Sequence, residues 1–222
     1  MFGFKSPSSL ISLISLNSLY ISCETASKSL YLCKHSIYER QHLNKAKGDY
    51  HNLICYRKAE LIYDITYHFA HSAFGVGDRT IDQMVQAARS GKQNIVEGNA
   101  DFETSIEMGI KLINVAKASF AELLADYEDY LRVNEYEQWS ENSEQYSAMR
   151  KLGRDGNNPQ RVEIAKSRPL HTVANMAIIL LKQEDYLLHQ LLQSLSDSFL
   201  QEGGFREKMF RMRLQQKNKT RQ

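Results

Sequence analysis

The chain has 222 residues, of which 42% are hydrophobic and 24% charged, with 11 Gly and 3 Pro. This length is sufficient for one or two domains with an apolar core. The composition excludes a collagen-like chain, low-complexity disorder and a disulfide scaffold. So few Gly and Pro residues also argue against an all-β protein with many tight turns.

The charges are distributed unevenly along the chain, although the formal net charge is only +2. Residues 1–49 hold 6 Lys or Arg and 3 Asp or Glu, a net charge of +3. Residues 50–202 hold 15 and 22, a net charge of −7, and residues 203–222 hold 7 and 1, a net charge of +6. The average therefore conceals a basic tail on an acidic body.

Residues 1–47 are expected to form a poorly ordered extension, with the compact domain beginning near Gly48. The segment 6–21 is rich in Leu, Ile and Ser, but it is too short and too rich in serine to suit a membrane span. A secretory signal stays open as an alternative, because residues 19–23 loosely resemble a lipoprotein cleavage box. A start codon assigned too far upstream is the other alternative.

From residue 50 onward the hydrophobic pattern is helical, and it predicts a first helix that ends at about Ala73. Thr80–Gln83 and Thr104–Glu107 each have the spacing of a capping box, which predicts the starts of the second and third helices. Gly98 is expected to end the second helix. The third helix has apolar residues on two adjoining stripes, which predicts that two of its sides are buried.

The periodicity is lost over residues 132–168, where we expect an excursion with one short helix at about 146–152. Pro169 opens the fourth helix, whose buried stripe is expected to include Val173, Met176, Ala177, Leu180, Leu187, Leu191 and Leu195. Residues 205–214 can form a short basic amphipathic helix. Together these elements predict an all-α protein, an antiparallel up-down four-helix bundle over residues 48–202, followed by a basic C-terminal helix and tail over 203–222.

No constellation of residues in the sequence supports catalysis, and we expect no enzymatic activity, metal or cofactor. His68 and His71 lie one helical turn apart, but no second pair completes a metal site. Asp126 and Asp129 are interpreted as part of a solvated acidic face. The cysteines Cys23, Cys33 and Cys55 share no metal-ligand spacing and favour a reducing, cytoplasmic location without a membrane anchor.

The most distinctive segment is 86–98, which combines small residues with polar residues near the expected helix end. Gly91 inside a helix costs about 1 kcal/mol relative to Ala, which is understandable if a neighbouring helix needs the space. Asn94 and Glu97 can bond loop backbone groups there. We interpret the segment as a structural motif, with ligand binding as the alternative; its residues are Ala87, Ala88, Gly91, Asn94, Glu97 and Gly98.

Residues 78–98, which end in Asn94-Ile95-Val96-Glu97-Gly98, resemble the signature of the four-helix-bundle proteins related to those encoded in 23S rRNA intervening sequences. The stretches 126–131 and 199–209 are similar to the branch named for a four helix bundle suffix domain. The resemblance covers about residues 48–214. It implies a non-enzymatic bundle that assembles as a ring-shaped pentamer, and in one related group an accessory protein that binds nucleic acid and a reverse transcriptase.

The first functional hypothesis is therefore a self-associating helical protein that binds RNA or another nucleic acid through its basic tail, since Lys and Arg neutralise phosphates. The candidate residues are Arg206, Lys208, Arg211, Arg213, Lys217, Lys219 and Arg221. Two alternatives remain. The tail residues are merely solvated, or the protein is a pure protein-interaction scaffold or accessory subunit whose tail docks on an acidic face of another subunit.

Overall fold

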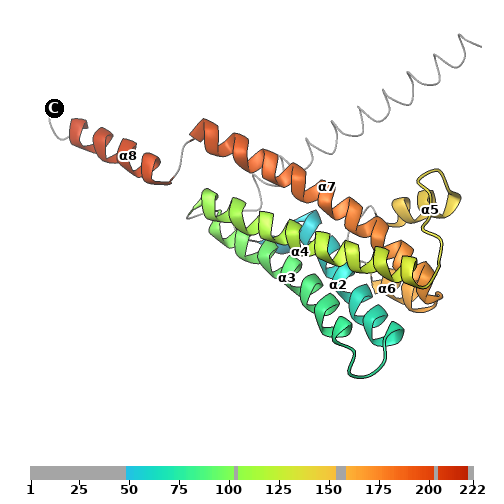
Figure 1. Ribbon diagram of the computed structural model, residues 1–222. Coiled ribbons are helices and arrows are strands. Elements are labelled where there is room, and N and C mark those ends of the chain that lie inside the picture. The colour runs from blue at the N-terminus through green and yellow to red at the C-terminus, as the bar shows by residue number, and fades with distance from the viewer. Residues whose placement is uncertain (1–48, 103–104, 154–158, 203–204, 220–222) are drawn as a thin grey trace, which may run out of the picture. The chain divides into compact units, whose positions relative to one another are not determined.

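The computed structural model describes residues 49–102, 105–153, 159–202 and 205–219 of the chain (Figure 1). These residues form seven α-helices and one short 3-10 helix, and no strand occurs among them. In chain order the elements are η2 (Tyr50–Asn52), α2 (Ile54–Ala73), α3 (Arg79–Asp101), α4 (Ile106–Val133), α5 (Glu144–Leu152), α6 (Pro159–Lys166), α7 (Leu170–Glu202) and α8 (Phe205–Lys219). The all-α class is confirmed, whereas the expected extension over 1–47 lies outside the described residues.

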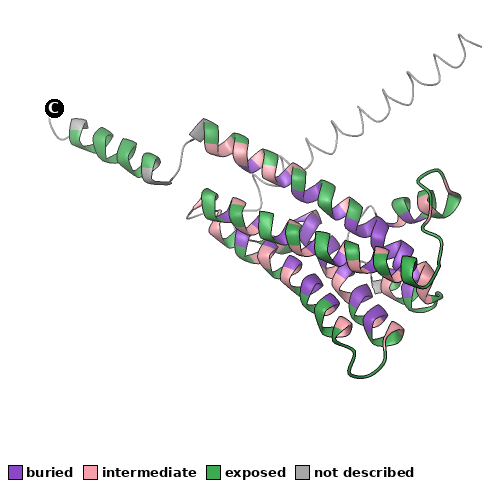
Figure 2. Ribbon diagram, viewed as in Figure 1, coloured by how far each residue is buried: buried purple, intermediate pink, exposed green. Residues whose placement is uncertain are grey.

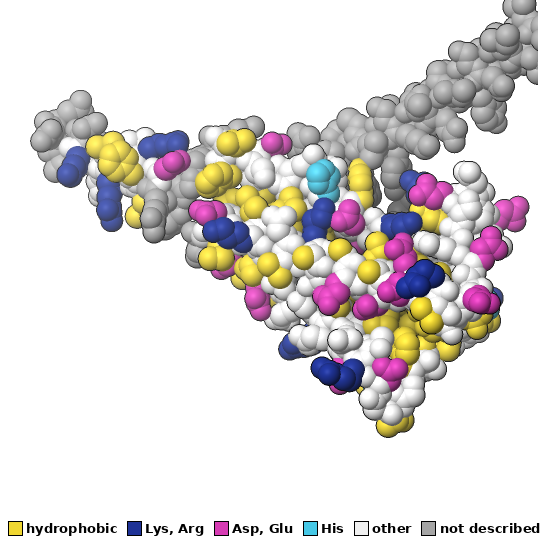
Figure 3. Space-filling model, in the orientation of Figure 1, with side chains coloured by type: hydrophobic (Ala, Val, Ile, Leu, Met, Phe, Trp, Pro, Cys, Tyr) yellow, Lys and Arg dark blue, Asp and Glu magenta, His cyan; other side chains and the backbone are white. Residues whose placement is uncertain are grey.

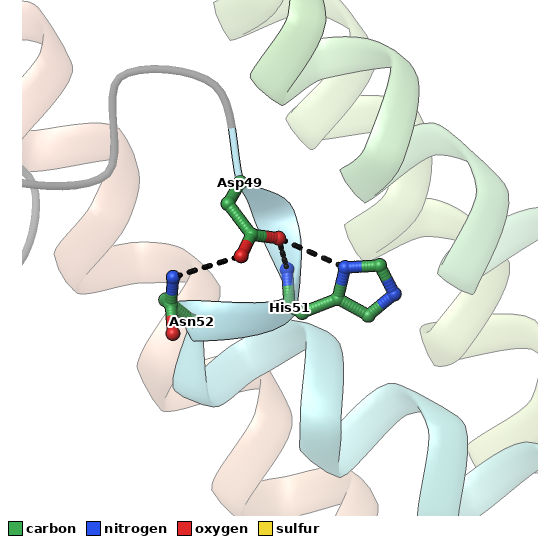
Figure 4. A network of polar contacts seen from close by, with 3 residues as sticks. All are labelled: Asp49, His51 and Asn52. Carbon is green, nitrogen blue, oxygen red and sulfur yellow. Dashed lines mark hydrogen bonds and ion pairs between the residues drawn. The ribbon is translucent and has the colours of Figure 1, made fainter.

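A cluster of hydrogen bonds around Asp49 opens the described part of the chain (Figure 4). The carboxylate lies 2.8 Å from His51 Nδ1 and accepts from the backbone N–H of His51 at 3.0 Å and from Asn52 Nδ2 at 3.1 Å. The hydrogen bonds with the His51 side chain and backbone lower the pKa of Asp49, because they favour its ionised form. The carboxylate thus caps η2, immediately after the expected start of the domain at Gly48.

The start of α3 differs from the expected capping box at Thr80. Asp78 is the N-cap, and its carboxylate accepts a hydrogen bond from the backbone N–H of Thr80 at 2.9 Å. Hydrogen bonds with Thr80 lower the pKa of Asp78. The prediction was wrong because an aspartate two residues earlier is available, and aspartate is the stronger N-cap of the two.

The junction between α3 and α4 also differs from the prediction. Gly98 does not end α3, which continues to Asp101, and the backbone N–H of Phe102 bonds to the carbonyl of Gly98 at 3.2 Å. The N-cap of α4 is Ser105, whose hydroxyl accepts from the backbone N–H of Met108 at 3.3 Å. The expected cap, Thr104, lies outside the described residues. The short connection makes α3 and α4 antiparallel neighbours.

Four long helices, α2, α3, α4 and α7, pack around one apolar core with antiparallel contacts (Figures 1 and 2). Around this core α3 lies between α2 and α4, and α7 lies between α4 and α2. All seven residues of the stripe expected in α7, from Val173 to Leu195, are buried. In α3 the spacing predicts a stripe of five apolar residues. Met84, Ala88 and Ile95 are buried, whereas Ile81 and Val85 are half-buried. The helical spacing of apolar residues therefore located the core correctly.

The excursion 132–168 contains two helices, α5 and α6, where the sequence predicted one. Helix α5 packs against α7, and α6 packs against both α2 and α7. This cover explains why residues 173–181 of α7 are buried without interruption. Asn175 holds the entry of the excursion, since it accepts from the Trp139 N–H at 2.7 Å and donates to the Glu137 carbonyl at 3.1 Å.

Helices α3 and α4 approach closely at positions without side chains. A Cβ atom at Gly91 would lie 2.5 Å from Cζ of Phe120. A Cβ atom at Gly98 would lie 3.3 Å from the carbonyl oxygen of Gly109 on α4. Helix α4 therefore occupies the space that a side chain at Gly91 would need, which accounts for a glycine in the middle of a helix.

Replacing Gly91 by Ala should destabilise the protein, although alanine is the better helix former. The new methyl group would overlap the buried ring of Phe120, and overpacking of this kind costs about 1–3 kcal/mol. Chemical denaturation of the wild type and Gly91→Ala measures this loss. The control is Gly75→Ala, because open space surrounds Gly75; an equal loss in both variants would contradict the steric explanation.

Candidate functional site

Helix α8 (Phe205–Lys219) carries most of the basic residues selected from the sequence. The side chains of Arg211, Arg213 and Lys217 are exposed. Positions 206, 208 and 219 lie on the same helix, but their side chains are outside what the structure describes, as is all of Arg221. The structure therefore shows three of the seven candidate cations with exposed side chains on this helix.

These three cations point to different sides of α8. At 100° per residue, Arg213 and Lys217 lie on one side of the helix and Arg211 lies nearly opposite. Arg211 is 3.9 Å from Glu207, and both side chains are exposed, so their attraction is weak. No ion pair among the described residues involves Arg213 or Lys217. Their charges are available to an anionic partner.

The expected amphipathic pattern of α8 is wrong. Met209 and Met212 lie on one side of the helix, whereas Phe210 and Leu214 lie on another. All four are exposed, with 63% of the surface of Phe210 and of Met212 accessible. Apolar and basic residues therefore alternate around the helix instead of occupying separate faces. The apolar stripe expected from the sequence is Phe205, Met209 and Met212, and it does not include Phe210 and Leu214; the side chain of Phe205 lies outside what the structure describes.

The small residues of the structural motif lie on the side of α3 that faces α4. Ala87 and Ala88 are buried, as are Gly91 and Gly98. The Phe120 ring and the Ile113 side chain fill the space next to the two glycines. A ligand would find no room at Gly91, so the geometry favours the structural interpretation of these small residues.

Asn94 and Glu97 do not bond a loop, because α3 extends beyond them to Asp101. Asn94 Nδ2 donates to the carbonyl oxygen of Ser90 at 2.8 Å, within the same helix. The hydroxyl of Ser90 lies 3.0 Å from that of Ser119 on α4. Glu97 is exposed. Ser90, next to the motif, therefore makes a polar contact from α3 to α4 that the sequence did not predict, and Asn94 bonds to Ser90.

A buried lysine is the main polar feature that sequence reasoning missed. Lys58 on α2 is 2% exposed, and its Nζ donates to the carbonyl of Gly153 and, at 2.7 Å, to Oε1 of Gln183. Gln183 Nε2 in turn donates to the carbonyl of Arg150 at 2.9 Å. Lys58 thus ties the end of α5 to α2 and α7. The sequence did contain a signal for its burial, because Lys58 lies three residues before Leu61, within the buried apolar stripe of α2.

The titratable groups of the described residues do not form a metal-binding cluster. No group of three or more His, Cys, Asp or Glu within the described ranges could hold a metal ion. His71 Nδ1 lies 2.8 Å from the carbonyl of Tyr67, and the two rings are 4.3 Å apart. His71 also lines a shallow hollow of about 220 Å³ at the α2–α3 turn, together with Phe74, Val76, Gly77, Asp78, Ile81 and Asp82.

Acidic side chains crowd together on the outer side of α4. Asp126 is half-buried, and burial followed by the charges of Glu122 and Asp129 raises its pKa. Asp129 is paired with Arg132 at 2.7 Å. The predicted solvated acidic face therefore contains one carboxyl group that is partly removed from water and repelled by its neighbours.

Comparison with known proteins finds no family model, no curated protein and no solved structure that matches this chain. None of the described helices is both long enough and apolar enough to cross a membrane.

Replacing Lys58 by Met should destabilise the protein by about 1–3 kcal/mol, because the Gly153 carbonyl and the Gln183 amide would lose a buried donor. The end of α5 should exchange its amide hydrogens faster than in the wild type. Lys111→Met is the matched control, since Lys111 is exposed and makes only a surface ion pair with Glu107. Unchanged exchange in α5 of the Lys58 variant would contradict the assigned tie.

Replacing Asp126 by Asn should stabilise the protein near neutral pH, because the ionised carboxylate is repelled and partly desolvated. A carboxyl group with a raised pKa takes up its proton in the folded state first, so the wild type gains stability as the pH falls through that pKa. The difference between the two proteins in free energy of unfolding should therefore shrink from pH 7 towards pH 3. Denaturation at a series of pH values tests this, with Asp197→Asn as an exposed control.

Proposed function

We propose that this chain is a self-associating, non-enzymatic helical-bundle protein that binds RNA or another nucleic acid through α8 and the residues after it. The proposal includes the finer architecture, an up-down four-helix bundle resembling 23S rRNA intervening-sequence proteins. It assigns no catalytic residue, metal or cofactor. The observation that carries it is the exposure of Arg211, Arg213 and Lys217 on a helix of net charge +5.

Phosphate binding by such a helix follows from counterion release. Each phosphate that a Lys or Arg neutralises releases condensed cations, so the affinity falls steeply as salt is added. The body over 50–202 has a net charge of −7 and repels phosphates, whereas residues 203–222 have a net charge of +6 and attract them. An oligomer would bring several such helices together and multiply the attraction. Self-association and nucleic-acid binding therefore support one another.

The resemblance of residues 78–98 supports the same proposal, since relatives with this signature form ring-shaped pentamers. The small residues of the signature lie where α3 meets α4, with Gly91 against Phe120. A signature that serves helix packing suits a family defined by its fold and not by a catalytic centre. A pentameric ring is accordingly the form of self-association that we propose.

A protein-interaction scaffold without a direct nucleic-acid role is the second candidate, for example an accessory subunit of a reverse transcriptase. The exposed side chains of Phe210, Met212 and Leu214 favour it, because apolar side chains gain nothing from contact with phosphates. Aromatic residues and Met are also enriched in protein interfaces. The two candidates differ in what the same helix contacts.

The binding of a single-stranded RNA by the full chain, measured by fluorescence anisotropy over a series of salt concentrations, tests the proposal. The variant Arg211→Gln/Arg213→Gln/Lys217→Gln should bind more weakly. Its plot of log affinity against log salt should be less steep by about 2, since each phosphate contact on a single strand contributes about 0.7.

The matched control is Arg79→Gln/Arg89→Gln/Lys111→Gln, which removes three exposed cations from α3 and α4. This variant should keep the affinity and the salt slope of the wild type. Equal slopes for all three proteins, or no binding by the wild type at low salt, would refute binding through α8 and leave the scaffold as the better candidate.

A further inference from the structure

The outer side of α4 carries apolar and acidic residues along one line. Residues seven apart on a helix lie nearly one above the other, and Met108, Val115 and Glu122 have this spacing. The surface is continued towards the end of α4, and we refer to the whole set as the α4 stripe: Met108, Val115, Glu122, Asp126, Asp129 and Val133. Figure 3 shows apolar and acidic side chains next to one another over α4.

The apolar members of the α4 stripe are exposed in the single chain. The accessible fractions are 47% for Met108, 48% for Val115 and 69% for Val133. The sequence predicted that two sides of α4 are buried, but the described chain covers only the side that faces α3 and α7. Of the second apolar stripe expected in α4, Leu123 is buried within the chain, whereas Val115 is exposed and free to make a contact outside the described helices.

The acidic members of the α4 stripe lack a cationic partner at its centre. Asp129 is paired with Arg132, but no ion pair among the described residues involves Glu122 or Asp126. Burial and its acidic neighbours raise the pKa of Asp126, so the centre of the stripe is a site of unrelieved repulsion. A cation placed over Glu122 and Asp126 would relieve it.

One face of α8 has the complementary composition. Met209, Met212 and Arg213 lie within about 100° of one another around the helix, and Lys217 lies next to Arg213 one turn further on. All four side chains are exposed. This face combines apolar groups with cations, as the α4 stripe combines apolar groups with carboxylates.

We propose that this face of α8 docks on the α4 stripe of a second copy of the chain. The inference rests on the self-association proposed above, for which it names the two surfaces, and it does not require nucleic acid. The methionines cover Val115 on α4, and Arg213 and Lys217, further along α8, approach Glu122 and Asp126. Arg211, on the opposite side of α8, stays available to a phosphate.

The α8 face is shorter than the α4 stripe and covers its central part. From Met209 to Lys217 the face is about 12 Å long, and the part of the α4 stripe from Val115 to Asp126 is about 16 Å long. A contact between two different surfaces of identical chains either closes into a reciprocal dimer or ring, or continues into a filament. The docking therefore determines the kind of assembly as well as its strength.

Charge reversal tests the docking, with the molar mass of the full chain measured by light scattering over a range of concentrations without nucleic acid. Glu122→Lys/Asp126→Lys on α4 and Arg213→Glu/Lys217→Glu on α8 should each weaken self-association about tenfold or more. Mixing the two variants should restore it, because each altered surface then meets a complementary one. High salt should weaken the wild-type assembly.

Two matched controls keep the test specific. Glu141→Lys/Asp197→Lys makes the same change in net charge at exposed positions outside α4, and Arg211→Glu reverses a charge on the opposite side of α8. Both should assemble like the wild type. Circular dichroism of every variant verifies that the helices are intact.

The outcomes separate this inference from the proposed function. A wild-type oligomer whose mass is unchanged in both test variants would overturn the docking and leave self-association standing. A wild type that stays monomeric at every concentration would overturn both. Loss of RNA binding at unchanged mass in the test variants would also overturn the docking, since α8 would then serve only nucleic acid.

Discussion

The close approach of α3 and α4 is the constraint on which the rest of the fold depends. Two helices can come this near only where one of them lacks side chains, and Gly91 provides that position opposite the Phe120 ring. Once α4 is fixed against α3, its other inward positions meet α7, and Tyr127 can donate a buried hydrogen bond to Thr66 on α2 at 3.0 Å. This buried hydrogen bond therefore depends on the close approach of α4 that Gly91 permits.

Much of the fold was predictable because helix faces repeat in the sequence. The apolar stripes of α2 and α7 were located from spacing alone, and Ala73 was correctly expected to end α2. The cap of α3 was missed because the spacing of Thr80 and Gln83 fits a capping box, although Asp78 is the stronger N-cap. Lys58 escaped prediction for a different reason, since its partners Gly153 and Gln183 lie 95 and 125 residues further along the chain.

The candidate site shows the same division between local and distant information. The basic character of α8 is a property of composition, so it was evident from the sequence. How Phe210 and Leu214 are arranged around α8 could be predicted only once the ends of that helix were known. The exposure of the α4 stripe could be predicted only once it was known which helices pack against α4. In the docking proposed above, Arg213 and Lys217 contact the α4 stripe, so an anionic ligand competes for these two cations while Arg211 stays available to it.

The cover that α5 and α6 provide over α7 has a consequence for how the chain folds. Nine consecutive residues of α7, 173 to 181, are buried, so no side of this part of the helix is suited to water. Until α5 and α6 have packed against α7, this surface is an exposed apolar patch that can associate with another partly folded chain. A shortened version of the protein without α5 and α6 should therefore expose this surface and tend to aggregate.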